Sequence, residues 1–226
     1  MYTYKYPRPA LTVDIVVFTL RANSLQVLLI QRAGEPYRGK WALPGGFVHI
    51  EEDLETAARR ELEEETGLFD AYLEQFHTFG APQRDPRGRV VTIAYYALIP
   101  AKAPIWSAGG SDAAQARWFP ICDLPKLAFD HDKIIEYGLK RLRHTLANTA
   151  VAFELHPVEF PLSEIQRTYE IILGEKLDDR KFLQRILSVG VIEEVTAIPT
   201  GKGRSARRYR FRQDAVMEIK SRQLIP

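Results

Sequence analysis

The carboxylates best placed to do chemistry lie in one short segment, 54–66, whose periodicity predicts a helix. At 100° per residue, Glu61 and Glu65 fall within the apolar stripe of this helix and Glu64 lies at its edge. A carboxylate pair that faces the body of a protein must be compensated, either by an arginine or by a cation. Arg60 can pair with Glu64, which leaves Glu61 and Glu65, one turn apart, as an oxygen pair suited to a hard divalent ion such as Mg2+.

The residues around this helix match the signature of a known family. The signature reads Gly, five residues, Glu, seven residues, then Arg-Glu-apolar-any-Glu-Glu-any-Gly-apolar. The matching residues are Gly46, Glu52, Arg60, Glu61, Leu62, Glu64, Glu65, Gly67 and Leu68. Because every specified position is present, the chain resembles the Nudix hydrolases. The resemblance implies an α/β/α sandwich in which this loop-helix-loop binds a divalent metal and cleaves a diphosphate attached to another group.

The Nudix resemblance also implies roles for single residues. The metal, Mg2+ or Mn2+, would be held by Glu61, Glu64, Glu65 and the carbonyl of Gly45. Glu52 would pair with Arg60 and brace the loop against the helix. Some members take a general base or a further metal ligand from a later loop, and Asp112 is the nearest candidate here. A turn residue that caps its own backbone is the alternative for Asp112.

Further residues in the first part of the chain could contact a phosphorylated substrate. Arginine suits phosphate because its guanidinium can form charge-assisted, bidentate hydrogen bonds. The candidate substrate contacts are Arg32, Gly46, Arg84, Arg87 and Arg89. An ordinary exposed surface position is the alternative for each of the four arginines.

A mixed α/β domain is expected to position these residues. Apolar alternation predicts strands at 11–20, 25–32, 69–79, 89–99 and 116–119. Helical spacing predicts helices at 54–66 and 131–146. We expect this domain to span residues 1–147 and a connection without strong signals to span 148–160.

Residues 161–226 predict a small helix-turn-helix followed by a hairpin. Ser163 and Gln166 have the spacing of a capping box at the start of the first helix. Asp178 precedes the second helix, which Gly190 ends. The hairpin strands are predicted at 191–195 and 207–211.

The second helix of this module is expected to pack on one side and to offer donors on the other. The expected apolar side consists of Phe182, Leu183, Ile186 and Leu187. Lys181, Gln184 and Arg185 lie opposite, where they could reach base edges and phosphates in a DNA major groove. The hairpin would act as a wing whose phosphate contacts are Arg204, Arg207, Arg208 and Arg210. A solvated helix beside a basic loop is the alternative.

The chain as a whole resembles the Nudix-related, NrtR-type transcriptional regulators. The stretches that carry this resemblance are 84–91, 129–132 and 162–170. It implies that a Nudix domain senses ADP-ribose or a related nucleoside diphosphate, and that a C-terminal winged helix binds double-stranded DNA of NAD-metabolism or sugar-use genes. Some members only bind their ligand, but the intact signature here also predicts metal-dependent hydrolysis of ADP-ribose.

Two classes of function therefore compete. We favour a regulator that retains pyrophosphatase activity, because Lys181 and the basic wing have no role in an enzyme alone. The alternative is a dedicated Nudix pyrophosphatase whose C-terminal domain does not bind DNA. A homodimer is expected because two winged helices on one two-fold axis would match a palindromic operator.

Composition narrows the class of protein further. The 226 residues are 46% hydrophobic and 27% charged, which argues against intrinsic disorder. No apolar run approaches the ~18 residues of a membrane span, so we expect a soluble, cytoplasmic protein without membrane partners. The net charge is only +2, yet residues 200–212 contain six basic side chains and no acid. The single cysteine, Cys122, excludes an internal disulfide and is expected to be a small buried residue.

Overall fold

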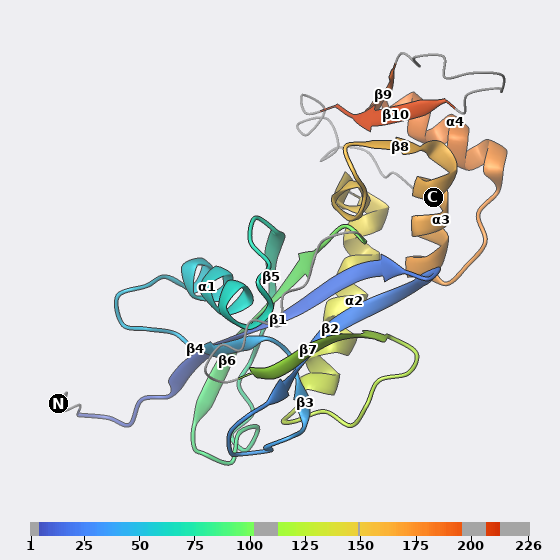
Figure 1. Ribbon diagram of the computed structural model, residues 1–226. Coiled ribbons are helices and arrows are strands. Elements are labelled where there is room, and N and C mark those ends of the chain that lie inside the picture. The colour runs from blue at the N-terminus through green and yellow to red at the C-terminus, as the bar shows by residue number, and fades with distance from the viewer. Residues whose placement is uncertain (1–4, 102–112, 149, 196–206, 213–226) are drawn as a thin grey trace. The chain divides into compact units, whose positions relative to one another are not determined.

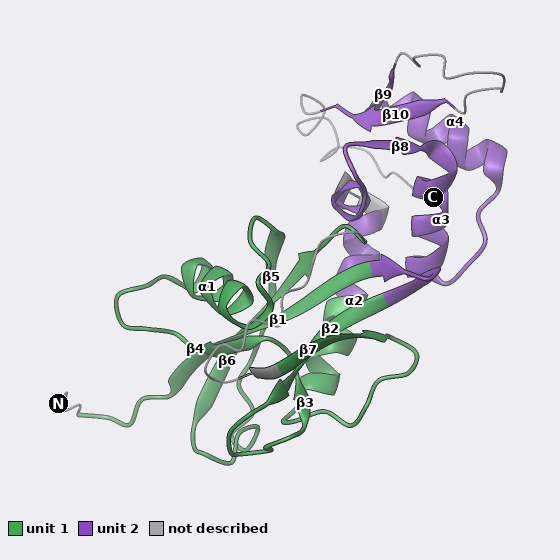
Figure 2. Cartoon of the chain, in the orientation of Figure 1, with its two compact units in different colours: residues 1–19, 26–139 green, residues 20–25, 140–226 purple. Residues whose placement is uncertain are grey.

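The chain divides into two compact units in the computed structural model, which describes residues 5–101, 113–148, 150–195 and 207–212. Unit 1 contains Met1–Thr19 and Gln26–Leu139, and unit 2 contains Leu20–Leu25 and Lys140–Pro226 (Figures 1 and 2). The division falls inside helix α2 (His131–Asn148), at residue 139.

The elements alternate between strands and helices. Those that begin in the first 140 residues are β1 (Ala10–Arg21), β2 (Ser24–Arg32), β3 (Trp41–Ala42), β4 (Gly45–Phe47), α1 (Leu54–Thr66), β5 (Tyr72–Phe79), β6 (Val90–Leu98), β7 (Ala113–Pro120) and α2 (His131–Asn148). The later ones are the 3-10 helix η1 (Ala150–Leu155), β8 (Glu159–Pro161), α3 (Leu162–Leu173), α4 (Asp179–Val189), β9 (Ile192–Val195) and β10 (Arg208–Phe211). No helix in these described ranges is long and apolar enough to cross a membrane.

A mixed sheet forms the centre of unit 1 (Figure 1). Its main path is β3-β2-β1-β6-β5, with β4 paired to β1 and β7 paired to β2. Strands β1 and β6 are parallel, and the pairs β1–β4, β2–β3, β2–β7 and β5–β6 are antiparallel. The register of β4 on β1 sets Gly45 opposite Asp14 and Gly46 opposite Val13. The first glycine of the family signature therefore lies directly beside the central strand.

Alternate residues of β1 contact helices on opposite faces of this sheet. Val13 and Ile15 belong to the same core cluster as Leu62 of α1. Val16 points the other way, because a Cβ added to Gly138 of α2 would lie 3.2 Å from its side chain. The structure thus confirms the predicted α/β/α sandwich, with both faces of β1 buried.

Unit 2 contains a three-stranded sheet in the order β8-β10-β9, together with α3 and α4. Tyr169 of α3 and Phe182 of α4 meet edge to face, with ring centroids 5.4 Å apart. The N-cap of α4 is Asp178, whose side chain accepts a hydrogen bond from the Lys181 amide at 2.8 Å. The predicted helix-turn-helix and hairpin are confirmed in these described residues.

Some local predictions for unit 2 are wrong. Ser163 and Gln166 do not form a capping box, because α3 already begins at Leu162, straight after β8, and its N-cap Pro161 gives no side-chain bond. The Gln166 amide donates to the Leu177 carbonyl and to Asp179 instead. The segment expected to be a plain connection contains η1 and β8, which pairs with β10.

Two predictions for unit 1 also need correction. The strand expected from residue 69 begins at Tyr72, because Asp70 has a φ of +57°, outside the β region, and Phe69 is exposed. Cys122 is exposed and not buried. It follows the end of β7 in a turn, where the chain has already left the sheet.

Candidate functional site

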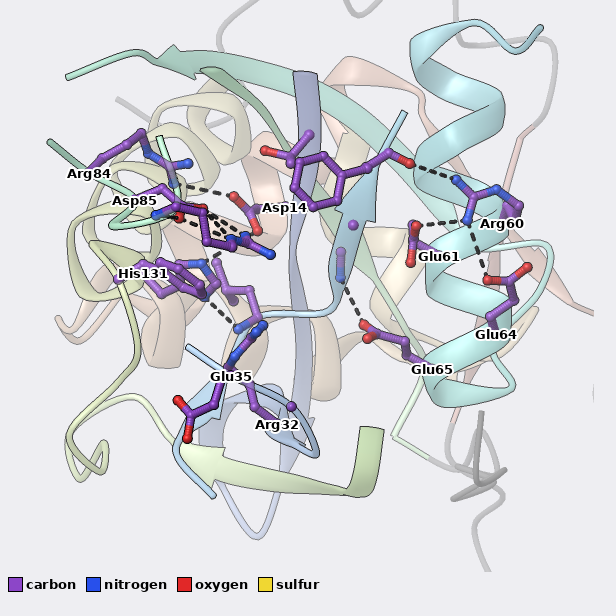
Figure 3. Close-up of a pocket in the computed structure, with 18 of the residues that line it drawn as sticks. Asp14, Arg32, Glu35, Arg60, Glu61, Glu64, Glu65, Arg84, Asp85 and His131 are labelled. Carbon is purple, nitrogen blue, oxygen red and sulfur yellow. Dashed lines mark hydrogen bonds and ion pairs between the residues drawn. The ribbon is translucent and has the colours of Figure 1, made fainter. Parts of the chain in front are cut away.

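Unit 1 contains a cavity of about 620 Å³, within the range of small-molecule sites. Figure 3 shows carboxylates and Arg60 of α1 along one wall and Arg84, Asp85 and His131 along the opposite wall. Asp14 of β1 lies beside Arg84 on this opposite wall. Charges of both signs surround the cavity, which suits a polar, charged ligand.

The α1 wall holds the two carboxylates that the helical spacing turned inward. Glu65 is only 7% exposed, and its Oε2 accepts a hydrogen bond from the Gly45 amide at 2.8 Å. Glu61 is also largely buried, and this burial raises the pKa of its carboxyl group despite the hydrogen bond from Arg60. Both groups line the cavity.

Arg60 compensates more of this charge than the sequence suggested. Its Nη1 lies 2.7 Å from Glu61 and 3.3 Å from Glu64. Its Nε and Nη2 donate to the two Glu52 oxygens at 3.0 and 2.7 Å, which is the pairing expected from the resemblance. One guanidinium nitrogen of Arg60 thus contacts Glu61 as well as the expected Glu64.

The two adjacent glycines are required by close packing. A Cβ on Gly45 would lie 2.1 Å from the Val13 carbonyl oxygen, and its φ of +150° is one that other residues rarely adopt. A Cβ on Gly46 would lie 2.2 Å from Glu61 Oε1. Any larger residue at either position would push β4 away from β1 or displace the Glu61 carboxylate.

The donor set on α1 suits a hard divalent cation by its chemistry. Glu61, Glu64 and Glu65 all bring carboxylate oxygens to one cavity wall. Within the part of the chain that the structure describes, no three His, Cys, Asp or Glu side chains converge into a ready metal cage. Arg60 instead engages Glu61 and Glu64, and the Gly45 amide engages Glu65. A cation would therefore require Glu61 and Glu64 to turn away from Arg60.

A buried charge network forms the opposite wall. Arg84 donates from Nε and Nη2 to the two Asp130 oxygens at 3.1 and 2.6 Å, and Nη2 lies 3.5 Å from Asp14. His131 Nδ1 accepts from the Leu43 amide at 2.8 Å, so the proton of the neutral ring lies on Nε2, 3.5 Å from Asp14. Burial lowers the pKa of His131, which favours the uncharged ring. The sequence analysis did not select Asp14 or His131 as site residues. Asp14 could have been selected, because it is the single acidic residue within an apolar strand.

The predicted substrate arginines separate into three cases. Arg84 is buried and already paired with carboxylates. Arg89 does not line the cavity and donates to the Gly80 carbonyl. Arg32 and Arg87 line the cavity, as does Gly46. Asp112, the candidate base, lies outside the described residues.

Arg32 and Arg87 belong to an aromatic cluster that the sequence did not reveal. The Arg87 guanidinium lies 4.9 Å from the ring centre of Phe47 and 5.5 Å from that of Phe129. Arg32 lies 5.0 Å from the same Phe129 ring. Asp85 fixes Arg87 through hydrogen bonds of 2.7 to 3.2 Å. Cations held against rings offer both charge for phosphate and flat surface for a base.

Helix α4 of unit 2 exposes the donors that were predicted for it. Lys181, Gln184 and Arg185 are all exposed. The expected apolar side is partly wrong. The buried residues of α4 are Phe182, Ile186 and Val189, whereas Leu183 and Leu187 are 39% and 47% exposed. Compared with the predicted orientation, α4 is turned about its own axis, so that Val189 and not Leu187 lies on the packed side.

The wing arginines are exposed but paired with neighbouring glutamates. The ion pairs are Arg207 with Glu194 at 3.7 Å, Arg208 with Glu159 at 3.8 Å, and Arg210 with Glu193. Such exposed pairs are weak and exchange readily for other partners. Arg204 lies outside the described residues, so its expected role is not visible.

The Glu52–Arg60 pair predicts a specific pH dependence of unit 1. The hydrogen bond from Arg60, aided by the His49 amide, lowers the pKa of Glu52 from 4.5 to about 2. Because the folded-state pKa is lowered, the stabilisation is complete above pH 4.5 and is lost as the pH falls towards 2. Glu52→Gln should therefore flatten the loss of unfolding free energy over this interval, measured by urea titration. Glu63→Gln, an exposed control on the same helix, should leave the slope unchanged. Equal slopes for wild type and Glu52→Gln would contradict the pairing.

Both units match families of known proteins. The NUDIX domain model matches residues 9–138, and the NrtR DNA-binding winged helix domain model matches residues 152–211. The ADP-ribose pyrophosphatase of Methanocaldococcus jannaschii is 40% identical over 134 residues, which are 58% of this chain and 73% of that protein. These matches confirm the mixed α/β Nudix fold followed by a winged helix.

Full-length similarity extends across both units. The ADPR responsive transcriptional repressor NtrR of Acinetobacter baylyi is 40% identical over 210 residues, which are 91% of this chain and 83% of that protein. Shewanella oneidensis NrtR, crystallised with a 27mer DNA, is similar with a TM-score of 0.80 and 34% identity over 92% of this chain and 95% of its own. Its NUDIX domain, crystallised with ADP ribose, has a TM-score of 0.56 and 39% identity over 62% of this chain and 94% of that chain. The chain therefore belongs to the NrtR family of Nudix-related transcriptional regulators.

Proposed function

We propose that this chain is a repressor that binds double-stranded DNA through unit 2 and releases it when ADP-ribose, or a related nucleoside diphosphate, binds in the cavity of unit 1. The observation that carries the proposal is the combination, in one chain, of a charged Nudix cavity with a helix-turn-helix that exposes a cationic face. Relatives described as responsive to ADP-ribose and as bound to DNA support both halves.

The cavity has suitable chemistry for an ADP-ribose-like ligand. Arg32 and Arg87 supply positive charge for a diphosphate, while Phe47 and Phe129 supply rings against which a planar base could stack. Arg84 acts differently from the first expectation: it holds Asp14 and Asp130 in place and so shapes the wall. Gly46 lines the cavity and could contact the ligand through its backbone. Arg89 does not line the cavity, so we do not propose it as a ligand contact.

A mobility-shift assay tests the proposed response. Duplex DNA from the region upstream of the chain's own gene should be bound at low salt, and ADP-ribose should weaken this binding about 5- to 150-fold, the usual scale of coupling between two sites. ADP-glucose serves as a control for a diphosphate with another sugar. Binding that ADP-ribose does not change would reject the sensor, and absence of any DNA binding would reject the repressor.

The proposal includes a retained pyrophosphatase activity. Mg2+ or Mn2+, held by Glu61, Glu64, Glu65 and the Gly45 carbonyl, would supply charge neutralisation of the diphosphate and activation of water. Glu52 holds Arg60, and Arg60 in turn holds Glu61 and Glu64 near the cavity. Asp112 stays the candidate general base.

Glu65→Gln tests this activity. The substitution removes the charge of a ligand without changing its size, so hydrolysis of ADP-ribose to AMP and ribose 5-phosphate should fall by about 10- to 100-fold or more. Product formation with Mg2+ and with Mn2+ is the measurement. Glu63→Gln, which changes an exposed glutamate two residues earlier, is the matched control and should keep full turnover. Equal turnover for wild type and Glu65→Gln would contradict the metal-ligand assignment.

The intact signature also keeps one competing function open. A dedicated pyrophosphatase with an unused C-terminal unit would hydrolyse ADP-ribose rapidly and fail to shift DNA even at low salt. Lys181, Gln184 and Arg185 would then be an ordinary solvated face. We favour the repressor because these donors lie on the second helix of a helix-turn-helix, directly before a hairpin whose arginines can exchange glutamate for phosphate.

We further propose a homodimer in the cytoplasm. Two winged helices related by a two-fold axis would contact two half-sites of a palindromic operator about one turn, or a multiple of one turn, apart. Groove contacts would come from Lys181, Gln184 and Arg185, and phosphate contacts from Arg204, Arg207, Arg208 and Arg210. Sedimentation equilibrium tests the assembly: a monomer at micromolar concentration, with and without DNA, would reject it.

A further inference from the structure

Helix α4 exposes a pair of leucines that the packing of unit 2 does not use. Leu183 and Leu187 are 39% and 47% exposed, although both are large apolar residues. They are four residues apart, so they lie one above the other on the same side of the helix. The buried side is already complete with Phe182, Ile186 and Val189. Among the described residues of unit 2, the pair therefore lies on the surface.

Positive and amide side chains flank this leucine pair. Arg180, Lys181 and Gln184 are exposed on α4 and project on the side away from its buried residues. The two carboxylates at the start of the helix are engaged elsewhere: Asp178 caps the Lys181 amide, and Asp179 accepts from Gln166. The exposed face of α4 thus combines a small apolar patch with cations and an amide.

This combination fits the floor and walls of a DNA major groove. Thymine is the base that presents a methyl group there, adenine presents the N6 and N7 atoms that glutamine can bind, and phosphates line both edges. A second copy of the chain would need several hundred Å² of matching surface on each partner, more than two leucines provide. The surrounding cations would also repel an identical face.

We infer that Leu183 and Leu187 contact thymine methyl groups in the major groove, and that they make α4 select half-sites rich in A·T pairs. This inference rests on the proposed DNA binding of unit 2. The two leucines are roughly 6 Å apart along the helix axis. That spacing corresponds to about two base-pair steps of 3.4 Å, so each leucine can reach a separate base pair. Gln184, between them in sequence, is suited to an adenine of the same segment.

The test replaces thymine by deoxyuridine, which lacks only the methyl group. Duplexes that bind the full chain are first selected from a random-sequence library, and each thymine of the selected site is then replaced in turn. For wild type, one or two replacements in each half-site should weaken binding about fourfold each, which corresponds to about 0.8 kcal/mol for one buried methyl. Leu183→Ala and Leu187→Ala should each bind the thymine and deoxyuridine forms of one position equally.

Matched variants separate this role from others. Val158→Ala removes an exposed apolar residue of the same unit outside α4 and should keep the thymine preference. Arg210→Ala should weaken binding to all sequences but leave the ratio of thymine to deoxyuridine affinity unchanged. Circular dichroism and thermal unfolding verify that the leucine variants are folded.

The possible failures are distinguishable. If no duplex is selected, the proposed DNA binding fails and this inference with it. If duplexes are selected but deoxyuridine is bound as tightly as thymine at every position, only the role of the leucines is rejected. The same rejection follows if the leucine variants dissociate an oligomer while the thymine preference persists, because the pair would then be a contact between copies.

Discussion

Two inward-facing carboxylates on α1 are the constraint around which the cavity of unit 1 is built. Glu61 and Glu65 lie on the side of the helix that packs against the sheet, and leaving either charge unpaired there would be costly. Arg60 and the Gly45 amide provide the compensation, and Glu52 in turn fixes Arg60. Gly46 follows from the same constraint, because a Cβ there would meet the Glu61 carboxylate, whereas Gly45 is required by its close approach to the backbone of β1.

The opposite wall of the cavity also consists of carboxylates that are compensated by an arginine. Its buried polar groups are Asp14 of β1, Arg84 of the loop before β6 and His131 at the start of α2, and the partly buried Asp130 pairs with Arg84. Buried ion pairs add little net stability compared with apolar packing, whereas breaking one typically costs about 3 to 5 kcal/mol. We therefore interpret both networks as a fixed electrostatic frame for a charged ligand, with Arg32 and Arg87 left at the rim to contact it.

Local patterns predicted the elements of this fold better than they predicted its contacts. Helix α1 has the bounds 54–66 that its apolar spacing predicted, and the family signature located one wall of the cavity. The Ser163 capping box failed because β8 delivers the chain directly into α3, a tertiary effect. The cluster of Phe47, Arg87 and Phe129 joins residues 40 and 42 positions apart in the sequence, so no local period could reveal it. The predicted apolar side of α4 was partly wrong because the apolar residues of this helix cover more than one side. Only packing in the folded unit selects which of them are buried.

The proposed regulation requires that ligand binding in unit 1 and DNA binding in unit 2 be thermodynamically coupled. A ligand can change DNA affinity only if it binds the DNA-competent and DNA-free states with different free energies. Thermodynamic linkage then requires that DNA change the affinity for the ligand by the same factor. Calorimetric titration of ADP-ribose into the protein alone, and into the protein saturated with its DNA, tests this directly. The Kd for ADP-ribose should be about 5- to 150-fold higher in the presence of DNA. Equal Kd values in the two titrations would contradict this coupling.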